Sequence, residues 1–413
     1  MSSNDVEVKE KILPIVKSLL KDNVEDYTIE IAKASKLGDN WLGLMYNITI
    51  TNSRKKGIPK LNLIIKLAPH QGPYRNVFPI RVIYDREIFV YDNISPEFLN
   101  FQREKEVAHI FQPFTKHYIT TMQNCGESLV MDNMKVKGFV TGNHSVEVDY
   151  PHALLVMKEM GKFHAMSYAI RDQKPETFKY FEKNCRETFF NSSLFEPVLK
   201  IIQTLGKKVL ESFDPISENL YLERLKNSLT KVASTFSDLL LVEKFGQYAV
   251  INHGDAQMRN FLFKYGNSEE PSVPTDLCLI DWQLARIASP VFDILWFIFI
   301  CTGQELRNRH YKYLLHEYYG SLSTLLRQLG SDPEKLLPFD VLMSDLKQFA
   351  PFGLYGAIWI AALNMTESTD IPDLYNSTSE DMIIEQLSVA PNEAYMKKIR
   401  EVVFDFVKYE YNF

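Results

Sequence analysis

The sequence predicts an α+β protein of two lobes, a small β-rich amino-terminal lobe and a larger, mainly helical carboxy-terminal lobe. Short apolar runs with strand-like alternation fill the first third of the chain, whereas segments of helical length dominate from Tyr150 onward. The chain has 413 residues, of which 46% are hydrophobic and 24% charged. It is long enough to bury a sizeable core and too long for one typical domain. We therefore expect a first lobe over residues 1–132, a linker over 133–143 and a second lobe over 144–413.

The first lobe is predicted to contain a hairpin near its start. Residues 27–31 and 44–50 alternate in the manner of strands, and Gly38 and Gly43 lie between them. Two glycines this far apart are not specific by themselves. Placed between two strands, however, the segment around Gly38 is a candidate for a loop that covers the phosphates of a nucleotide.

A lysine and a glutamate follow in an order that bears on function. Lys66 lies near the end of residues 60–69, an apolar run rich in branched side chains that is typical of a strand. Glu87 lies in the second half of a predicted helix over residues 80–91. Either residue alone would be interpreted as a solvated surface charge. Together with the motif described next, they predict that Lys66 pairs with nucleotide phosphates and that Glu87 holds Lys66 in place.

The strongest functional signal is a loop that combines two carboxylates and an amide. Asp255 and Asn260 lie five positions apart, and Asp281 ends an apolar run further along. Phosphoryl transfer from ATP depends mostly on positioning and on neutralising phosphate charge, usually through Mg²⁺, which prefers oxygen ligands. Asp255 can orient an acceptor hydroxyl, while Asn260 and Asp281 can hold Mg²⁺. His-Gly-Asp alone is more often a simple turn, so the hypothesis depends on its conjunction with the strand lysine and the helix glutamate.

The neighbours of this loop indicate which kind of kinase to expect. Protein kinases carry H-R-D and D-F-G motifs at comparable spacing, but this chain has Gly254 in place of the arginine and Trp282 after the second aspartate. These differences, and the missing Ala-Pro-Glu signature, disfavour a protein substrate. His253 is a candidate catalytic residue that we expect to support the loop backbone, with proton transfer as the less favoured role. His164 is expected to be a packed helix histidine.

These motifs, together with the helical segment over residues 160–167, resemble the ecdysteroid kinase-like family of insects, which is also described as choline-kinase-like and has a bilobal protein-kinase-like fold. The resemblance covers nearly the whole chain. It implies ATP-dependent phosphorylation of an alcohol hydroxyl, with an ecdysteroid, a similar steroid or a foreign compound as the acceptor. It also implies that residues 128–134 lead into a hinge where Asp132 and Met134 meet the adenine, and that Asp293 braces the catalytic loop.

Two classes of function remain open from the sequence. The first is a small-molecule kinase that uses ATP and Mg²⁺. The second is a catalytically silent, pseudokinase-like protein that binds a nucleotide or another ligand without transferring phosphate. Retention of Lys66, Asp255, Asn260 and Asp281 favours the first class, because a pure binding protein needs neither metal ligands nor a carboxylate that orients the acceptor. The sequence specifies neither the acceptor nor the oligomeric state.

Composition narrows the expected partners and location. The net charge of −6 and the lack of a basic stripe argue against a nucleic-acid partner. The apolar runs over residues 294–301 and 350–363 are shorter than the roughly 20 residues that span a membrane, so both are predicted to be core helices. The polar, acidic amino terminus shows no targeting signal. We therefore expect a cytoplasmic protein whose partner is a small-molecule hydroxyl acceptor, without a membrane.

Overall fold

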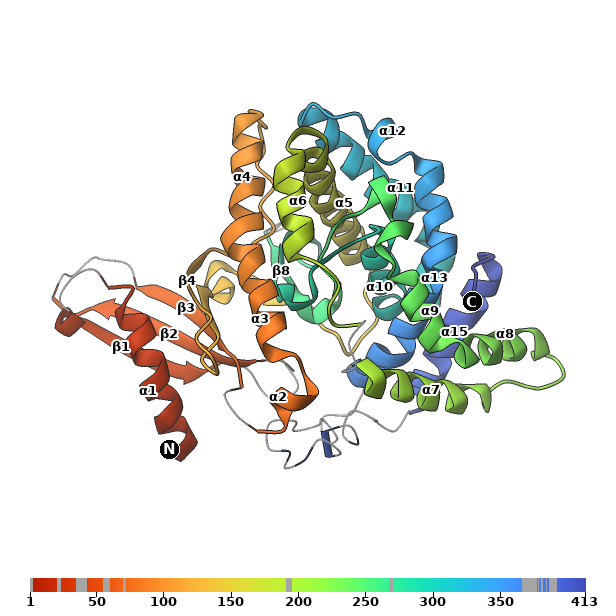
Figure 1. The fold of residues 1–413 in the computed structure, drawn as a ribbon, viewed down its shortest axis with the longest axis horizontal. Coiled ribbons are helices and arrows are strands. Elements are labelled where there is room, and N and C mark those ends of the chain that lie inside the picture. The colour runs from red at the N-terminus through yellow and green to blue at the C-terminus, as the bar shows by residue number, and fades with distance from the viewer. Residues whose placement is uncertain are drawn as a thin grey trace.

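The computed structural model of the chain describes residues 3–20, 24–34, 43–54, 60–69, 72–190, 195–266, 270–365, 377, 379, 382–383, 385 and 392–413. Figure 1 shows strands and one helix at one end of the molecule and a larger body of helices at the other. The predicted α+β architecture, with a β-rich first lobe and a mainly helical second lobe, is confirmed. Within the described ranges, no helix is both long enough and apolar enough to cross a membrane.

The first lobe is built on a five-stranded antiparallel sheet with the order β1-β2-β3-β5-β4. Its strands are β1 (Tyr27–Lys33), β2 (Leu44–Asn52), β3 (Leu61–Leu67), β4 (His117–Thr121) and β5 (Ser128–Asp132). The predicted pairing of the first two strands is present, since Ile29 lies opposite Ile50. Side chains alternate across a strand, so one face of β2 and β3, which carries Ile48 and Ile65, turns toward helix α1 (Ser3–Lys17), where Ile12 and Val16 are fully buried.

The opposite side of the sheet faces a continuous helical segment. The short helix α2 (Tyr74–Val77) precedes α3 (Ile80–Phe89), which passes through a π-helical turn (Val90–Ile94) into α4 (Ser95–Glu104). The predicted helix over residues 80–91 is thus α3 and the start of this turn. Phe98 of α4 contacts Phe163 of the second lobe, with 5.8 Å between ring centroids. The segment that carries Glu87 is therefore packed against both lobes.

The segment predicted as a linker contributes a strand to the second lobe. It contains a 3-10 turn (Met134–Lys137) and β6 (Phe139–Thr141), which pairs with β8. The strands of this lobe are β7 (Val250–Asn252), β8 (Phe261–Tyr265), β9 (Pro274–Leu279) and β10 (Arg286–Ala288), arranged as β6-β8-β9 and β10-β7. The candidate catalytic loop joins β7 to β8, and Asp281 follows β9, so sheet pairing brings both aspartates to the same region.

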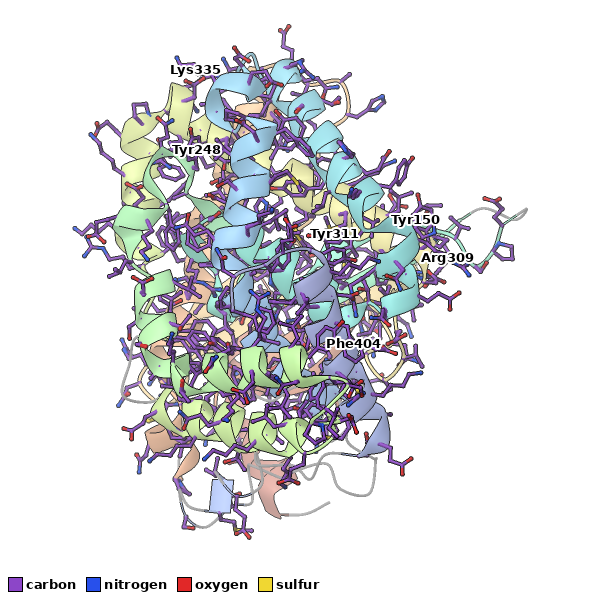
Figure 2. The ribbon with its side chains drawn as sticks, turned by 90° about the vertical axis from the view of Figure 1, so that its right-hand side faces the viewer. Tyr150, Tyr248, Arg309, Tyr311, Lys335 and Phe404 are labelled. Carbon is purple, nitrogen blue, oxygen red and sulfur yellow. The ribbon has the colours of Figure 1, made fainter. Side chains whose placement is uncertain are left out.

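Helices make up the rest of the second lobe. They are α5 (Tyr150–Gln173), α6 (Pro175–Asn184), α7 (Glu196–Leu210), α8 (Asn219–Thr230), α9 (Val232–Leu239), α10 (Val291–Cys301), α11 (Gln304–Gln328), α12 (Pro333–Leu336), α13 (Phe339–Asn364) and α15 (Glu393–Lys408). The helical segment that begins at Asn219 is divided at Lys231 into α8 and α9. Figure 2 views this lobe from the side that carries Tyr311 of α11 and Phe404 of α15.

The centre of this lobe is the contact between α10 and α13. Every residue of α10 is buried, and the apolar run over residues 350–363 lies in α13, where all of it but the half-buried Leu363 is buried, as predicted for a core helix. Small residues let the two helices approach closely. A Cβ atom on Gly356 would lie 2.5 Å from the ring of Trp296. The absence of a side chain at this position therefore makes room for the tryptophan.

Candidate active site

A cavity of about 450 Å³ is lined by residues of both lobes. Its volume lies within the range of about 300–1,000 Å³ that is usual for small-molecule sites. The predicted site residues in its wall are Lys66, Glu87, Asp132, Met134, Asn260 and Asp281. Gly38, the remaining predicted nucleotide-binding residue, lies outside the described residues. The fold thus gathers residues from the sheet, from α3, from the hinge segment and from two loops of the second lobe around one space.

Lys66 is at the centre of a three-residue ion cluster. Its Nζ lies 2.7 Å from Glu87 Oε2 and 2.7 Å from Asp281 Oδ1. The side chains of Lys66 and Glu87 are only 2% and 1% exposed, whereas that of Asp281 is 26% exposed. The pairing of Lys66 with Glu87 expected from the sequence is therefore present. Asp281 joins it across the lobe boundary, from the side that is open to the cavity.

The cluster has an excess of negative charge, because one ammonium faces two carboxylates. Burial lowers the pKa of Lys66, but attraction to Asp281 and Glu87 outweighs burial, so the pKa is raised overall. Burial raises the pKa of Glu87 to about 7, against the opposing influence of Lys66. A cation bound beside Asp281 would relieve this excess. The electrostatics of the cluster are therefore suited to a ligand that brings its own metal ion.

Asp281 and Asn260 offer the oxygen atoms that such a metal would need. Asp281 has a φ of 66°, a left-handed conformation that aspartate tolerates better than most residues. The Nδ2 atom of Asn260 donates to Asp255, so its amide oxygen is the atom that can coordinate a metal. The described residues contain no cluster of three His, Cys, Asp or Glu side chains suited to a metal. Mg²⁺ bound with a nucleotide needs fewer protein ligands, because phosphates and water complete its coordination. The residues present thus fit Mg²⁺.

Asp255 is oriented by three hydrogen-bond donors. Gln257 Nε2 lies 2.8 and 2.9 Å from its two carboxylate oxygens. Asn260 Nδ2 lies 2.9 Å from Oδ2, and Trp296 Nε1 lies 3.0 Å from Oδ1. Burial raises the pKa of Asp255, while the hydrogen bond from Gln257 opposes this shift. A carboxylate held in this way can accept a hydrogen bond from a hydroxyl group in a defined direction.

The backbone beneath this carboxylate is held by a second aspartate. Asp293 accepts hydrogen bonds from the backbone N–H groups of His253 and Gly254, at 2.6 and 2.9 Å. His164 Nε2 lies 3.3 Å from Asp293, and its Nδ1 lies 2.7 Å from the Tyr318 hydroxyl. Burial raises the pKa of Asp293, but the hydrogen bond from His164 and other attractions outweigh it, so the pKa is lowered. His164 is packed, as expected, and it also supports this brace.

The loop geometry explains why histidine and glycine precede the aspartate. Gly254 has a φ of 86°, and a Cβ atom there would lie 1.9 Å from the carbonyl oxygen of Leu284, so a side chain cannot be accommodated. His253 Nε2 lies 3.0 Å from Ile280 O, and its Nδ1 accepts from the N–H of Asp255 at 3.3 Å. Both ring nitrogens thus contact the backbone. This geometry suits a supporting role for His253 rather than proton transfer.

Both predicted hinge residues line the cavity, and the polar groups of Asp132 are already engaged. The N–H of Asp132 donates to Lys116 O at 2.8 Å. Its carboxylate accepts from the Tyr118 hydroxyl at 2.8 Å and pairs with Lys137 at 2.6 Å. Met134 follows at the start of the 3-10 turn and lines the same cavity. Asp132 therefore forms part of the cavity wall while its carboxylate binds Tyr118 and Lys137.

Two residues that hold Asp255 were not identified from the sequence. Gln257 lies within the motif but shows no pattern that predicts its contact. Trp296 follows Asp293 by three positions on α10, and residues with this spacing share one face of a helix. The aspartate that holds the loop backbone and the tryptophan that holds the carboxylate therefore project from the same helix. That spacing was a usable signal for Trp296.

Comparison with known proteins gives a family and several solved structures. The family described as the ecdysteroid kinase-like family matches residues 37–331. An ethanolamine kinase of Plasmodium vivax is similar at 14% identity and a TM-score of 0.47, covering 98% of this chain and 90% of that chain. A glucosamine kinase structure, in crystal form B, gives 9% identity and a TM-score of 0.38, with 96% and 84% covered. A glucosamine kinase in complex with glucosamine, ADP and inorganic phosphate gives 10% identity and a TM-score of 0.36, covering 95% of this chain and 82% of that chain. No curated protein sequence matches significantly.

Proposed function

The chain belongs to the ecdysteroid kinase-like family, and from this premise we propose that it transfers the γ-phosphoryl group of ATP to an alcohol hydroxyl of a small molecule. The acceptor in this proposal is an ecdysteroid or a similar steroid or foreign compound. The observation that carries the proposal is that Lys66, Asp281 and Asn260 line one cavity, while Asp255, held by three donors, lies directly behind Asn260 through a hydrogen bond from its amide. This is the set of groups that phosphoryl transfer requires.

Each side chain then has a defined task on the nucleotide. Lys66, kept in place by Glu87, would pair with phosphate oxygens of ATP. Asp281 and Asn260 would hold Mg²⁺ through oxygen atoms. When bound, Mg²⁺ neutralises the charge on the β- and γ-phosphates. The hinge residues and the sheet enclose the adenine end of the cavity. These roles use the residues that line the cavity and the partners that hold them.

Asp255 acts on the acceptor. Its carboxylate accepts a hydrogen bond from the hydroxyl group and directs the oxygen lone pair toward the γ-phosphorus. The new bond forms between that oxygen and phosphorus, while the bond from phosphorus to the β,γ-bridging oxygen breaks and ADP leaves with the electron pair. The hydroxyl proton passes to Asp255 and then to solvent. The products are a phosphate ester and ADP, so atoms and charge balance.

The setting of the reaction is part of the proposal. We propose a cytoplasmic protein whose partner is its small-molecule acceptor, without nucleic acid or a membrane. The net charge of −6 supports the exclusion of nucleic acid, because an acidic protein repels a polyanion. The division of the chain into two lobes joined by a linker over residues 133–143 remains a prediction. Within that segment, β6 pairs with β8 of the second lobe.

The test is acceptor-dependent ADP release. Purified protein is incubated with Mg²⁺-ATP and a panel of ecdysteroids, sterols, choline-like alcohols and sugar alcohols. We expect ADP release that depends on at least one uncharged steroid alcohol and is lost in Asp255→Ala. Asp340→Ala, which changes an exposed aspartate at the start of α13, serves as the matched control. ATP binding without acceptor-dependent release would indicate the silent binding protein instead, and absence of nucleotide binding would rule out both.

A further inference from the structure

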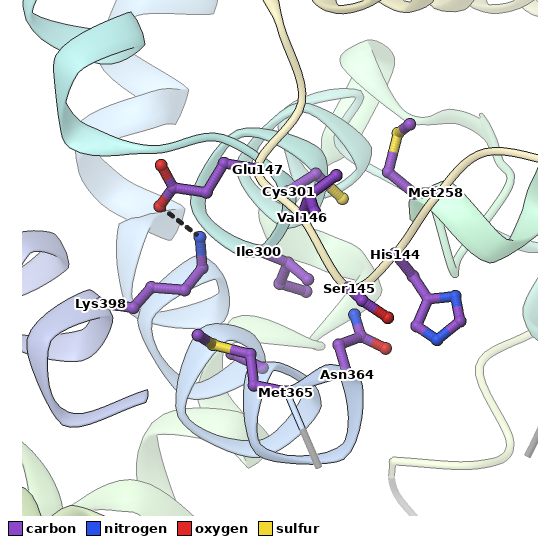
Figure 3. Close-up of a pocket in the computed structure, with 11 residues that line it drawn as sticks. His144, Ser145, Val146, Glu147, Met258, Ile300, Cys301, Asn364, Met365 and Lys398 are labelled. Carbon is purple, nitrogen blue, oxygen red and sulfur yellow. Dashed lines mark ion pairs between the residues drawn. The ribbon is translucent and has the colours of Figure 1, made fainter. Parts of the chain in front are cut away.

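Asn364, the last residue of α13, contacts the catalytic loop through both ends of its amide. Its Oδ1 accepts from Arg259 Nε at 2.9 Å, and its Nδ2 donates to Gln257 Oε1 at 3.3 Å. Asn364 is only 7% exposed. Figure 3 shows it beside a small pocket of about 40 Å³ that His144 and Met258 also line. One buried side chain thus connects a helix of the second lobe to two residues of the loop.

Arg259, Asn364, Gln257 and Asp255 are joined by a series of hydrogen bonds, and the carboxylate of Asp255 determines which group donates in each of them. Gln257 must turn its Nε2 toward Asp255, because an ionised carboxylate only accepts hydrogen bonds. Its Oε1 therefore faces Asn364, which must donate in turn. The oxygen of Asn364 is then left for Arg259, which has only donors. The four side chains form a head-to-tail chain that begins at a guanidinium and ends at the catalytic carboxylate.

The two ends of this chain serve different parts of the site. Arg259 lines the cavity beside Lys66 and Asp281, whereas Asp255 orients the acceptor hydroxyl in the proposed function. Hydrogen bonds in a chain polarise one another, more so away from water. We propose that Asn364 is a positioning residue for phosphoryl transfer, coupling Arg259 at the nucleotide cavity to the carboxylate of Asp255 through Gln257. This inference rests on the proposed function and adds a residue that holds both ends of the site in register.

Only an amide satisfies the position of Asn364. Asn364→Asp keeps an acceptor for Arg259 but places a carboxylate against Gln257 Oε1, where a donor is required. Asn364→Leu keeps the approximate size and removes both hydrogen bonds. Asn392→Ala is the matched control, because Asn392 holds the same end of α13 through Met365 O, at 3.0 Å, without touching the loop. If the Asn364 variants acted only by loosening the end of α13, Asn392→Ala would show the same change.

The first readout does not depend on activity. The indole proton of Trp296 bonds to Asp255, so its resonance in a ¹H–¹⁵N spectrum follows the titration of that carboxyl. The chain has 4 tryptophans, and Trp296→Phe assigns the signal. The charged or titratable neighbours whose fields reach Asp255 are Asp281, His253, Arg286 and Cys301. These four groups are unchanged in the Asn364 variants, and Asn364→Leu adds no charge, so a difference in its titration midpoint reports the series of hydrogen bonds.

We expect the midpoint of this titration to rise by about half a pH unit or more in Asn364→Leu and Asn364→Asp, because Gln257 no longer holds the ionised form firmly. The control should match the unchanged protein. Turnover of Mg²⁺-ATP, measured with water as acceptor and with any active alcohol, should fall about tenfold in both Asn364 variants, with the nucleotide KM changed far less.

Two results would overturn the inference. One is an unchanged midpoint in both Asn364 variants, and the other is an equal shift in Asn392→Ala, which would assign the effect to the helix end. The failure of the proposed function is separable from either result. If the unchanged protein shows no turnover, the proposed function fails, while the titration midpoint still decides whether Asn364 holds Asp255.

Discussion

The two sides of the site are held by different physical means. On the side that we propose binds the nucleotide, the nucleotide side, which comprises Lys66, Glu87 and Asp281, opposite charges lie 2.7 Å apart. On the side that we propose binds the acceptor, the acceptor side, which comprises Asp255 and its donors, neutral groups such as the indole of Trp296 orient one carboxylate. Charges that pair with each other can exchange partners when ATP and a metal arrive. A single carboxylate held by neutral donors keeps one direction, which suits the alignment of a hydroxyl.

The largest effect is expected from Asp255→Asn. The variant keeps the size of the side chain but cannot take up the hydroxyl proton, and it places an amide where three donors require an acceptor. General base catalysis typically contributes about 10²–10⁴-fold, and we expect a loss of that order in kcat. ATP affinity, measured by calorimetry with Mg²⁺, should change little. A parallel loss of ATP affinity would show that the two sides are not separable.

Lys66→Met should act on the nucleotide side, in stability and in binding. Removing one partner from a buried ion pair costs about 3–5 kcal/mol, because the other charge remains buried. Here Glu87 can take up a proton instead, since its pKa is about 7. We therefore expect the free energy of unfolding to fall more at pH 8 than at pH 5, and ATP affinity to be lost at both. Urea unfolding measures the first effect.

The double variant Lys66→Met with Glu87→Gln is the control for this reasoning. Because glutamine brings no charge into the site, it should recover part of the stability lost at pH 8 without restoring ATP binding. Equal loss of stability in the single and double variants would contradict the view that uncompensated charge at Glu87 is responsible.

A smaller effect is expected from Gly356→Ala, which tests the acceptor side from a distance. The added Cβ would meet the ring of Trp296 at 2.5 Å, and overpacking of this kind typically costs about 1–3 kcal/mol. Displacing Trp296 also removes a donor from Asp255. We expect lower stability in thermal unfolding and lower turnover, with ATP affinity unchanged. Gly320→Ala in α11 is the matched control, since no atom lies within 4 Å of a Cβ atom there. A comparable loss in both variants would argue against the role of Trp296.

The last effect, which concerns stability and not turnover, is a dependence of the free energy of unfolding on pH that comes from Glu87. Its pKa of about 7 in the folded protein lies above the ordinary value of 4.5. Between these values the folded protein keeps a proton that the unfolded chain has lost, so the free energy of unfolding falls as pH rises through this window. Glu87→Gln should remove this contribution, whereas Glu97→Gln on α4 should not. Urea unfolding from pH 4.5 to 7.5 would contradict the assignment if both variants kept the slope of the unchanged protein.

The nucleotide side was largely predictable from the sequence because short local patterns indicate the strand and the helix that carry it. The apolar, branched run of β3 and the apolar residues of α3 placed Lys66 on a strand and Glu87 on a helix, and their contact follows from packing the two elements together. The acceptor side was predictable only in part. Asp255 lies in a recognisable motif, but Trp296 is 41 residues away and Asn364 is 107 residues from Gln257. Contacts at such separations depend on the tertiary fold.

The fold shows the same division between local and long-range information. In the first sheet, β1, β2, β3 and β5 were predicted close to their observed bounds, whereas β4 was not predicted. The apolar run over residues 294–301 was predicted to be a core helix and lies in α10. Helix α11 was not predicted, although Tyr311, Leu314 and Tyr318 recur at helical spacing and are buried. The interruption between α8 and α9 at Lys231 shows no helix-breaking residue that would have indicated it. The short strand β6 was missed because its pairing partner, β8, lies more than a hundred residues further along the chain.

The most direct test of the central claim is transfer of a labelled γ-phosphoryl group. Protein, Mg²⁺ and ATP labelled at the γ-phosphate are incubated with each acceptor, and the small-molecule products are separated and their label measured. We expect a labelled phosphate ester with the unchanged protein, little or none with Asp255→Asn, and intact ATP binding in both. ATP that binds normally, yet labels no alcohol in the unchanged protein, would contradict the proposed function.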